Sequence, residues 1–276
     1  MTLTLASLRG VDVVDVGPRR KVFPSTIVLD IFDRNQIEKL FTETGPDFVV
    51  NCVGVLVRES ETNPFDAIWL NAAFPHVLSR LCADHDCKLI HVSTDCVFSG
   101  RQGPYREDDE RDGHMVYDRT KALGEVAQGT DLTIRTSIAG PELDSNGTGL
   151  FHWFMTQTGP VTGYARALWS GVMTPQLARF VCHVITSHSG LSGIVHYSTP
   201  GGISKYDLLR LFNASFDKNL SITAADTPVI DKRLLSTRPD VPLPPPGYRL
   251  QIDDTREWMR NHAKLYGHYE TARMPI

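Results

Sequence analysis

Tyr117 and Lys121 are the pair of residues whose types and spacing most clearly suggest chemistry in this chain. Residues four apart on a helix lie on one face, so both side chains can address one ligand. A neighbouring ammonium favours the phenolate form of tyrosine and lowers its pKa from a reference value of about 10. Tyr117 can then give a proton to a carbonyl oxygen while hydride reaches its carbon, which is general acid catalysis. The alternative is a helix on which both residues are merely solvated.

Thr94 supplies a hydroxyl group for the same carbonyl oxygen. It follows the apolar run Lys88–Ser93, which has the composition of a buried strand. Ligands of open α/β sheets bind at the carboxyl ends of the strands. The order of strand, hydroxyl residue, loop and helix therefore predicts Thr94, Tyr117 and Lys121 as the catalytic residues. Tyr117 and Lys121 are also expected to contact a nicotinamide cofactor, with Lys121 holding its ribose.

The elements that position these residues alternate between short β-branched runs and segments of helical periodicity, as in βαβ units. We predict strands at 11–16, 26–30, 48–53, 88–93 and 132–136, and helices at 34–44, 64–86, 174–187 and 204–215. The predicted fold class is α/β, with a Rossmann-like parallel sheet. Residues 1–140 would form the NAD(P)-binding domain, and residues 141–276 a smaller substrate lobe partly interleaved with it.

The N-terminal segment lacks the glycine-rich turn that opens such a domain. The first glycines, Gly10, Gly17 and Gly45, do not have the G-x-G-x-x-G spacing that places a pyrophosphate at a helix N-terminus. If residues 11–16 form the second strand of the domain, the sheet lacks or replaces its first strand. Thr2–Ala6 is the segment that could fill this position as a strand.

Five blocks of sequence carry a resemblance to a known family. They are Val49–Gly54, Leu70–His76, His91–Gly100, Gly103–Asp109 and Ile203–Leu209. Together they resemble the dTDP-4-dehydrorhamnose reductases, which are extended short-chain dehydrogenases/reductases. The resemblance covers roughly Val11 to Leu209. It implies NAD(P)H-dependent reduction of a keto group on a nucleotide-linked deoxysugar, with the three catalytic residues above in the positions of the family triad.

The resemblance also implies which residues contact the cofactor. They are Asp30 and Ile31 near the adenine, and Val53 and Gly54 farther along the molecule. Arg19 follows the strand predicted at 11–16, where an arginine can accommodate the 2′-phosphate of NADP(H). NADPH is therefore favoured over NADH, although Asp15 favours NADH and a basic loop is often only solvated.

On the substrate side, the resemblance places Val97 and Phe98 against the sugar nucleotide, and Asn71 behind the active site. Core packing is the alternative for Val53 and Val97, because apolar residues at strand ends are usually buried. Arg166 and Lys205 are candidates to bind the diphosphate, since cationic side chains suit phosphate oxygens. A surface salt bridge is the alternative for Lys205.

The composition excludes several other classes of function. With 276 residues, 41% hydrophobic, 22% charged and a net charge of −4, the chain is globular and has no basic field for nucleic acid. Its apolar runs are shorter than the roughly 20 residues that span a bilayer. The sequence shows no secretory signal and is predicted to be cytoplasmic. The five cysteines suit reduced thiols, and no metal site is predicted. The expected partner is a nucleotide sugar, and a homodimer is among the assemblies left open.

Three functional hypotheses follow. In the first, the natural protein is a complete reductase whose start lies upstream of residue 1. In the second, the chain is a non-catalytic relative that serves as a regulatory or assembly subunit. In the third, it is an epimerase or dehydratase acting on a nucleotide sugar, because extended short-chain enzymes share the tyrosine and the lysine.

Overall fold

A parallel four-stranded sheet forms the centre of the molecule. The computed structural model describes residues 1–17 and 21–269. The strand order is β10-β5-β4-β3, from Gly193–His196, Leu132–Thr136, Lys88–Thr94 and Phe48–Asn51. All three pairings are parallel, with Asn51 opposite His91 and Val92 opposite Ile134. The predicted α/β class with parallel strands is therefore confirmed.

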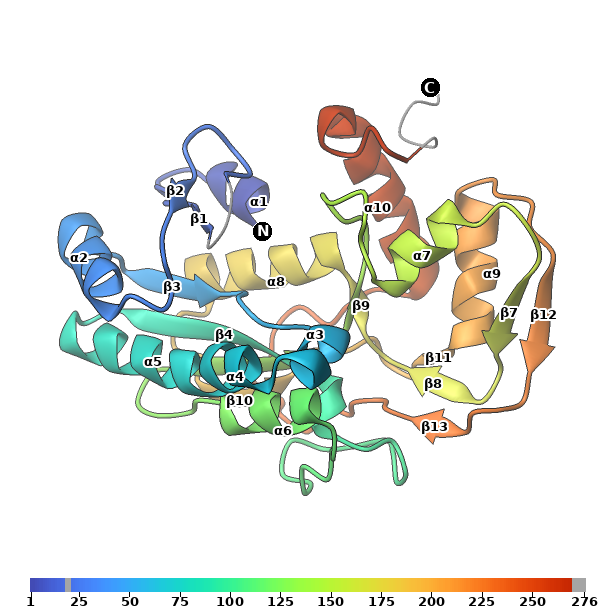
Figure 1. The fold of residues 1–276 in the computed structure, drawn as a ribbon, viewed down its shortest axis with the longest axis horizontal. Helices are drawn as coiled ribbons and strands as arrows, with labels where there is room; N and C mark the ends of the chain where they lie inside the picture. The colour runs from blue at the N-terminus through green and yellow to red at the C-terminus, as the bar shows by residue number, and fades with distance from the viewer. Residues whose placement is uncertain (18–20, 270–276) are drawn as a thin grey trace.

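Helices cover both faces of this sheet, as parallel sheets require. Figure 1 shows α8 (Thr174–Ser187) on one face and α5 (Phe74–Asp84) on the other. Neighbouring residues of β4 point to opposite faces, so Leu89 packs with Leu78 of α5 and Ile90 packs with Phe180 of α8. The sheet thus holds the end of β4, with Thr94, between two apolar layers.

Helix α2 (Arg34–Thr44) begins and ends where the sequence predicts. The carboxylate of Asp33 accepts hydrogen bonds from the backbone of Asn35 and Gln36. Gly45 ends the helix in the left-handed conformation at φ 51°, which glycine adopts without steric cost.

The predicted helix at 64–86 is continuous but not uniform. It consists of α4 (Pro64–Ala67), a π-helical segment η1 (Ile68–Ala73) and α5. A short helix, α3 (Val57–Thr62), precedes it. The sequence did not predict the π segment, and such segments are frequent at functional sites.

The N-terminal segment departs most from prediction. The strands expected at 11–16 and 26–30 are reduced to β1 (Val16–Gly17) and β2 (Ile27–Val28), which form their own two-stranded parallel sheet. The suggestion that Thr2–Ala6 forms a strand is wrong, because this segment is helix α1 and packs against α8. Within the described residues, β3 is therefore an edge strand of the main sheet.

The C-terminal half has a second apolar core. This core joins α7 (Leu150–Thr156), α9 (Lys205–Ser215) and α10 (Tyr248–Asn261), on the right of Figure 1. Its short strands are β6 (Ile138–Ala139) with β9 (Val172–Met173), β7 (Val161–Tyr164) with β12 (Ile222–Ala225), and β8 (Ala167–Trp169) between β11 (Ile203–Ser204) and β13 (Ile230–Asp231). As predicted, Ser204 caps α9 by accepting a hydrogen bond from the backbone of Asp207 at 3.0 Å. None of the helices in the described part of the chain is long and apolar enough to cross a membrane.

Candidate active site

The structure brings Thr94, Tyr117 and Lys121 together at the carboxyl end of β4. Thr94 ends the strand, and its Oγ1 accepts a hydrogen bond of 3.1 Å from the backbone N–H of Cys96 in the following turn, η2 (Asp95–Val97). Tyr117 and Lys121 both lie on α6 (Val116–Leu123), as the spacing predicts. The side chain of Thr94 interacts with that of Tyr117 and lowers its pKa. The two hydroxyl groups are therefore placed to contact one oxygen atom.

Lys121 is buried beside the same strand. Its side chain is 5% exposed, and Nζ donates a hydrogen bond of 2.8 Å to the carbonyl of Val92. Burial lowers the pKa of Lys121 to about 8, although Glu125 and Cys52 act in the opposite direction. Lys121 is thus fixed against β4 with two ammonium protons left for a further acceptor.

Contrary to the prediction, the pKa of Tyr117 is raised overall in the chain without ligands. Burial raises the pKa of Tyr117, and the nearby Cys96 and Asp95 raise it further, while the side chain of Thr94 lowers it. Tyr117 is therefore protonated at neutral pH, which is the form that a general acid requires.

Asn71, in the π segment, supports this arrangement from behind. Its amide nitrogen donates to the carbonyl of Val55 at 3.0 Å and to Thr120 at 3.3 Å, while its oxygen accepts from the backbone of Val55 at 2.8 Å. Asn71 thereby joins the loop after β3 to α6. Gly124 allows the close contact, because a Cβ there would lie 1.8 Å from the carbonyl oxygen of Asn71.

The residues expected to contact the cofactor lie at the ends of two strands. Val53 is half-buried and Gly54 is exposed after β3, while Asp30 is exposed and Ile31 is buried after β2. Arg19 lies outside the described residues. Exposed Gly54 and the free donors of Lys121 suit the nicotinamide end of a dinucleotide. No glycine-rich turn opens a helix among the described residues.

Val97 and Phe98 do not present side chains to a ligand. Both are fully buried in a cluster with Tyr105 and Leu234, and Phe98 stacks on Tyr105 with ring centres 4.3 Å apart. For Val97, this position agrees with the alternative of core packing. For both residues, contact with a substrate would have to come from the backbone.

The structure does not bring Arg166 to the catalytic residues. It is exposed on the turn between β7 and β8, where its carbonyl accepts a hydrogen bond of 3.0 Å from Ile230. None of the interactions found in the described residues joins its guanidinium to Thr94, Tyr117 or Lys121.

Two acidic residues and a second lysine near the site were missed in the sequence. Asp95 and Asp118 directly follow Thr94 and Tyr117, both are buried, and burial raises the pKa of each carboxyl group. Lys232 interacts electrostatically with both. Adjacency to the catalytic residues could have identified the two acids, but nothing in the sequence around Lys232 indicates this position.

Lys205, which the sequence did single out, also approaches this group. Its Nζ lies 4.6 Å from the centre of the Trp169 ring, and Asp95 interacts with it electrostatically. Burial lowers the pKa of Lys205 to about 8. Lys205 is therefore half-buried in the site, and the surface salt bridge considered as its alternative is not formed.

A buried ion pair fixes the strands next to Thr94. Arg135 of β5 is 2% exposed and binds both oxygens of Glu125, at 2.7 and 2.8 Å. The same carboxylate accepts a hydrogen bond of 2.8 Å from Ser93, the residue before Thr94. Two neighbouring strands and the segment after α6 are thereby held in one position.

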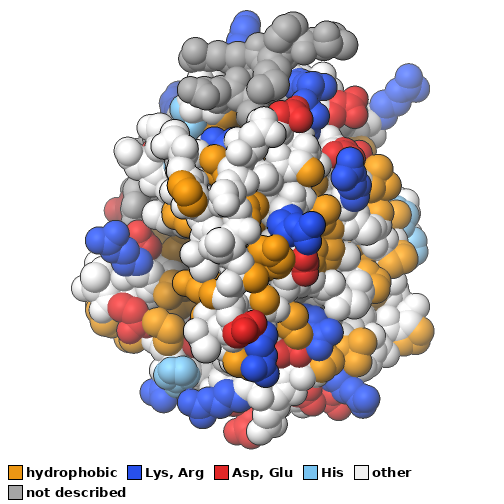
Figure 2. Space-filling view, turned by 90° about the vertical axis from the view of Figure 1, so that its right-hand side faces the viewer, with side chains coloured by type: hydrophobic (Ala, Val, Ile, Leu, Met, Phe, Trp, Pro, Cys, Tyr) orange, Lys and Arg blue, Asp and Glu red, His pale blue; other side chains and the backbone are white. Residues whose placement is uncertain are grey.

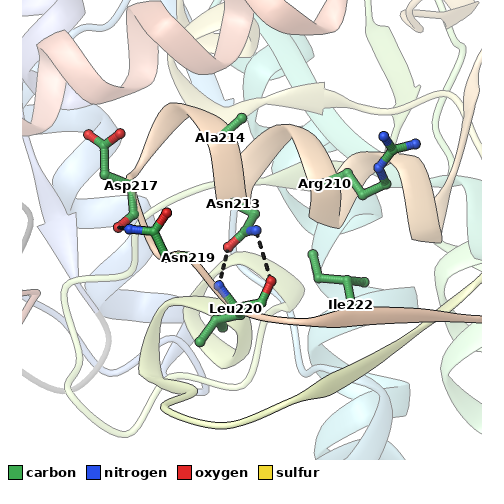
Figure 3. A pocket seen from close by; sticks show the side chains of 7 residues that line it. All are labelled: Arg210, Asn213, Ala214, Asp217, Asn219, Leu220 and Ile222. Atoms are coloured by element: carbon green, nitrogen blue, oxygen red, sulfur yellow. Dashed lines mark hydrogen bonds between the residues drawn. The ribbon is translucent and has the colours of Figure 1, made fainter.

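A surface hollow of about 260 Å³ lies elsewhere, between α9 and β12. Figure 3 shows the side chain of Asn213 bound to both backbone groups of Leu220, at 3.0 and 2.9 Å. Figure 2 shows this side of the molecule, with its Lys and Arg side chains dispersed rather than gathered in one patch. The hollow contains none of the predicted site residues. The described residues also hold no group of three metal-binding side chains.

The chain is similar to a known family of proteins. The family model for the RmlD substrate binding domain matches residues 5–233. A dTDP-4-dehydrorhamnose reductase of Mycolicibacterium smegmatis is 41% identical over 101 residues, which cover 36% of this chain and 30% of that protein. Matches to curated relatives such as this one span about a third to two thirds of their length.

Two solved structures show the same fold. A hypothetical dTDP-4-dehydrorhamnose reductase from Sulfolobus tokodaii has a TM-score of 0.78 at 23% identity, covering 91% of this chain and 94% of that one. The Bacillus anthracis dTDP-4-dehydrorhamnose reductase in complex with NADP has a TM-score of 0.73 at 19% identity, covering 83% and 88%. The match of the family model over most of the sequence shows that the chain belongs to the RmlD substrate binding domain family.

Proposed function

We propose that this protein reduces a keto group on a nucleotide-linked deoxysugar with NAD(P)H. The names of its relatives, which are dTDP-4-dehydrorhamnose reductases, support this proposal. The observation that carries the proposal is that Thr94 at the end of β4 interacts with Tyr117 of α6, while Lys121 of the same helix binds the carbonyl of Val92 in β4. Two hydroxyl groups that can both contact one carbonyl oxygen support a reduction of that carbonyl group.

The reaction follows from what each residue can do. Bound NAD(P)H supplies the hydride to the carbonyl carbon. Thr94 donates a hydrogen bond that orients the carbonyl oxygen, and Tyr117 transfers its hydroxyl proton to that oxygen. Lys121 holds the nicotinamide ribose, and its positive charge favours the tyrosinate that remains. Tyr117 then regains a proton from solvent.

The proposal also assigns a binding role to each half of the chain. Residues 1–140, together with β10 and α8, bind the cofactor, while most of 141–276 binds the nucleotide sugar. Asp30, Ile31, Val53 and Gly54 contact the cofactor, and NADPH is preferred over NADH. Arg166 would need to move to reach a bound diphosphate.

The proposed fold also includes a central position for a first strand. In a doubly wound sheet of order 3-2-1-4-5-6, the first strand lies at the centre. We infer that β2-β1 and β3-β4-β5 flank this central position. Exposed Val14, Val16 and Ile27, at 50%, 38% and 39%, support this inference, because valine and isoleucine of a completed parallel sheet are buried.

The proposal is tested by titrating the purified chain with NADPH and NADH, followed by nicotinamide fluorescence, and by turnover with dTDP-4-dehydrorhamnose. We expect NADPH to be oxidised in step with sugar reduction. Tyr117→Phe should keep its affinity for NADPH and lose about 100-fold or more in kcat, as expected for loss of a general acid. Tyr164→Phe, at an exposed tyrosine of β7, is the matched control and should leave kcat unchanged.

Two results would contradict the proposal. Conversion of the sugar without net consumption of NADPH would indicate an epimerase or dehydratase. Absence of cofactor binding at millimolar concentration would indicate a non-catalytic relative. Because pyrophosphate contacts normally supply much of the affinity, we expect a weak Kd for NADPH together with intact placement of Thr94, Tyr117 and Lys121.

A further inference from the structure

The segment 230–235 of the C-terminal half is hydrogen-bonded to the loop that follows strand β4. Asp231 donates a backbone hydrogen bond of 2.8 Å to Gly100, and Tyr105 donates one of 2.8 Å to Arg233. Leu235 in turn donates to Tyr105 at 2.7 Å. Two segments far apart in the sequence therefore run side by side directly beyond the η2 turn.

Lys232, in the middle of this segment, points toward the η2 turn. Its stem lies over Gly100, where a Cβ would come within 3.0 Å of Lys232 Cγ. Its ammonium interacts with the side chain of Cys96. Burial alone would lower the pKa of Lys232, but Cys96, Asp95 and Asp118 outweigh it and raise the pKa, so the side chain is charged at neutral pH.

Cys96 connects Lys232 to the catalytic hydroxyl groups. Its backbone N–H donates a hydrogen bond to Thr94 Oγ1 at 3.1 Å, and the side chain of Thr94 interacts with Tyr117. Contacts therefore run without a break from Lys232 through Cys96 and Thr94 to Tyr117. Lys205 also approaches Cys96 and Asp95, but its ammonium is placed over the Trp169 ring.

We propose that Lys232 is a positioning residue of the active site: by binding Cys96 and facing Asp95 and Asp118, it holds the η2 turn so that Thr94 and Tyr117 meet. A residue of the substrate lobe thereby sets the geometry of the catalytic pair. The kinetic part of this inference rests on the proposed function, whereas the link between Lys232 and Cys96 does not.

The link is tested by alkylation of Cys96 with iodoacetamide in the full chain, in a Cys52→Ser background because Cys52 is exposed. The thiolate is the reactive form, and burial raises the pKa of Cys96 to about 12 while Lys232 opposes this effect. Lys232→Met should therefore slow alkylation of Cys96 about threefold or more at pH 9. Lys232→Arg should restore the rate, and Lys264→Met, at an exposed lysine, should not change it.

The kinetic test uses the pH dependence of kcat. Tyr117 faces Cys96 and Asp95 of the η2 turn, Thr94 of β4 and Asp118 of its own helix. Without the cation of Lys232, the carboxylates of Asp95 and Asp118 disfavour the tyrosinate more strongly. Lys232→Met should therefore lower kcat about tenfold, leave KM for NADPH unchanged, and move the alkaline limb to higher pH.

The outcomes separate the two proposals. Unchanged alkylation of Cys96 in Lys232→Met would overturn the positioning role, whether or not the parent chain turns over. In an active enzyme, slower alkylation of Cys96 together with an unchanged alkaline limb of the pH profile of kcat would also overturn the positioning role. Labelling of the buried Cys82, Cys87 and Cys182 reports unfolding, and a rise in that labelling for Lys232→Met would show a structural role instead.

Discussion

Lys121 is held in a charged form that folding disfavours. Its pKa falls from an ordinary value of 10.5 to about 8, so burial costs about 3 kcal/mol below pH 8. The cost decreases between pH 8 and 10.5, where the unfolded chain binds the extra proton, and disappears above. A residue proposed to hold the nicotinamide ribose therefore lowers the stability of the fold.

We expect Lys121→Met to be more stable than the parent chain at neutral pH. Methionine fits the helix equally well, and the lost hydrogen bond to Val92 costs about 1 kcal/mol, which leaves a gain of about 2 kcal/mol at pH 7. Denaturant unfolding at pH 7 and pH 10 measures the difference, which should shrink at the higher pH. A variant less stable than the parent at pH 7 would refute this reasoning.

Removing one partner of the ion pair between Arg135 and Glu125 should, in contrast, destabilise the fold. Arg135→Met leaves a carboxylate in the core with the half-exposed Arg111 at 3.1 Å as its cation and Ser93 at 2.8 Å as a neutral donor, so we expect a loss of about 3 kcal/mol. The double variant Arg135→Met with Glu125→Leu should recover part of this loss, since neither member of the pair is then left as an unpaired buried charge. Urea unfolding of the single and double variants measures the coupling.

Glu38→Gln is the matched control for this comparison. Glu38 binds Arg34 at 2.8 Å, but both side chains are largely exposed, at 43% and 62%. Exposed pairs contribute less than about 1 kcal/mol. An equal effect in the two pairs would mean that burial does not decide the strength of the Arg135 pair.

The contact between α6 and the π segment determines where Tyr117 and Lys121 lie. Gly124→Ala would bring a Cβ to 1.8 Å from the Asn71 carbonyl and 3.2 Å from Ala72 Cα. Since both are backbone atoms, α6 must move. We expect a loss of about 1–3 kcal/mol in stability and a fall in kcat measured on the folded fraction.

Gly190→Ala provides the comparison for Gly124→Ala, because no atom lies within 4 Å of a Cβ at that position. It should leave both stability and kcat nearly unchanged. If Gly124→Ala loses stability but retains full kcat, the packing of α6 on the π segment does not govern the catalytic geometry.

Elements with strong local signals were predicted to within about a residue. Asp33 and Gly45 bound α2, Thr174–Ser187 is helical as predicted, and Lys88–Thr94 forms strand β4. Local capping groups and continuous apolar runs encode such elements, so periodicity alone identifies them.

Features that depend on distant partners were not predictable in this way. The strand at 11–16 shrank to Val16–Gly17, because strand extent depends on a neighbour and β1 pairs only with β2. Lys232 reaches Cys96 only through the pairing of β13 with β8. Likewise, Phe98 was expected to face substrate, but the Tyr105 ring that covers it belongs to a later loop.

Stability should be unequally distributed across the molecule. β4 and β5 have hydrogen-bonded neighbours on both edges, β3 has one within the described residues, and β1–β2 form a separate pair with exposed Val16 and Ile27. We expect amide hydrogen exchange to be slowest in β4 and β5, faster in β3 and fastest in β1–β2. Mass spectrometry of peptic peptides measures this order, and equal protection of β1–β2 and β5 would contradict it.

The proposed catalytic centre draws on both halves of the chain, and this sharing limits how such a gene can evolve. Thr94 and Tyr117 come from the first half, whereas Lys205, Lys232 and strand β10 come from the second. A crossover between two family members near codon 140 would combine a catalytic turn from one parent with the lysines that face it from another. Hybrids of this kind should mostly inherit mismatched contacts, so substrate range in this lineage should change by point mutation more readily than by exchange of halves.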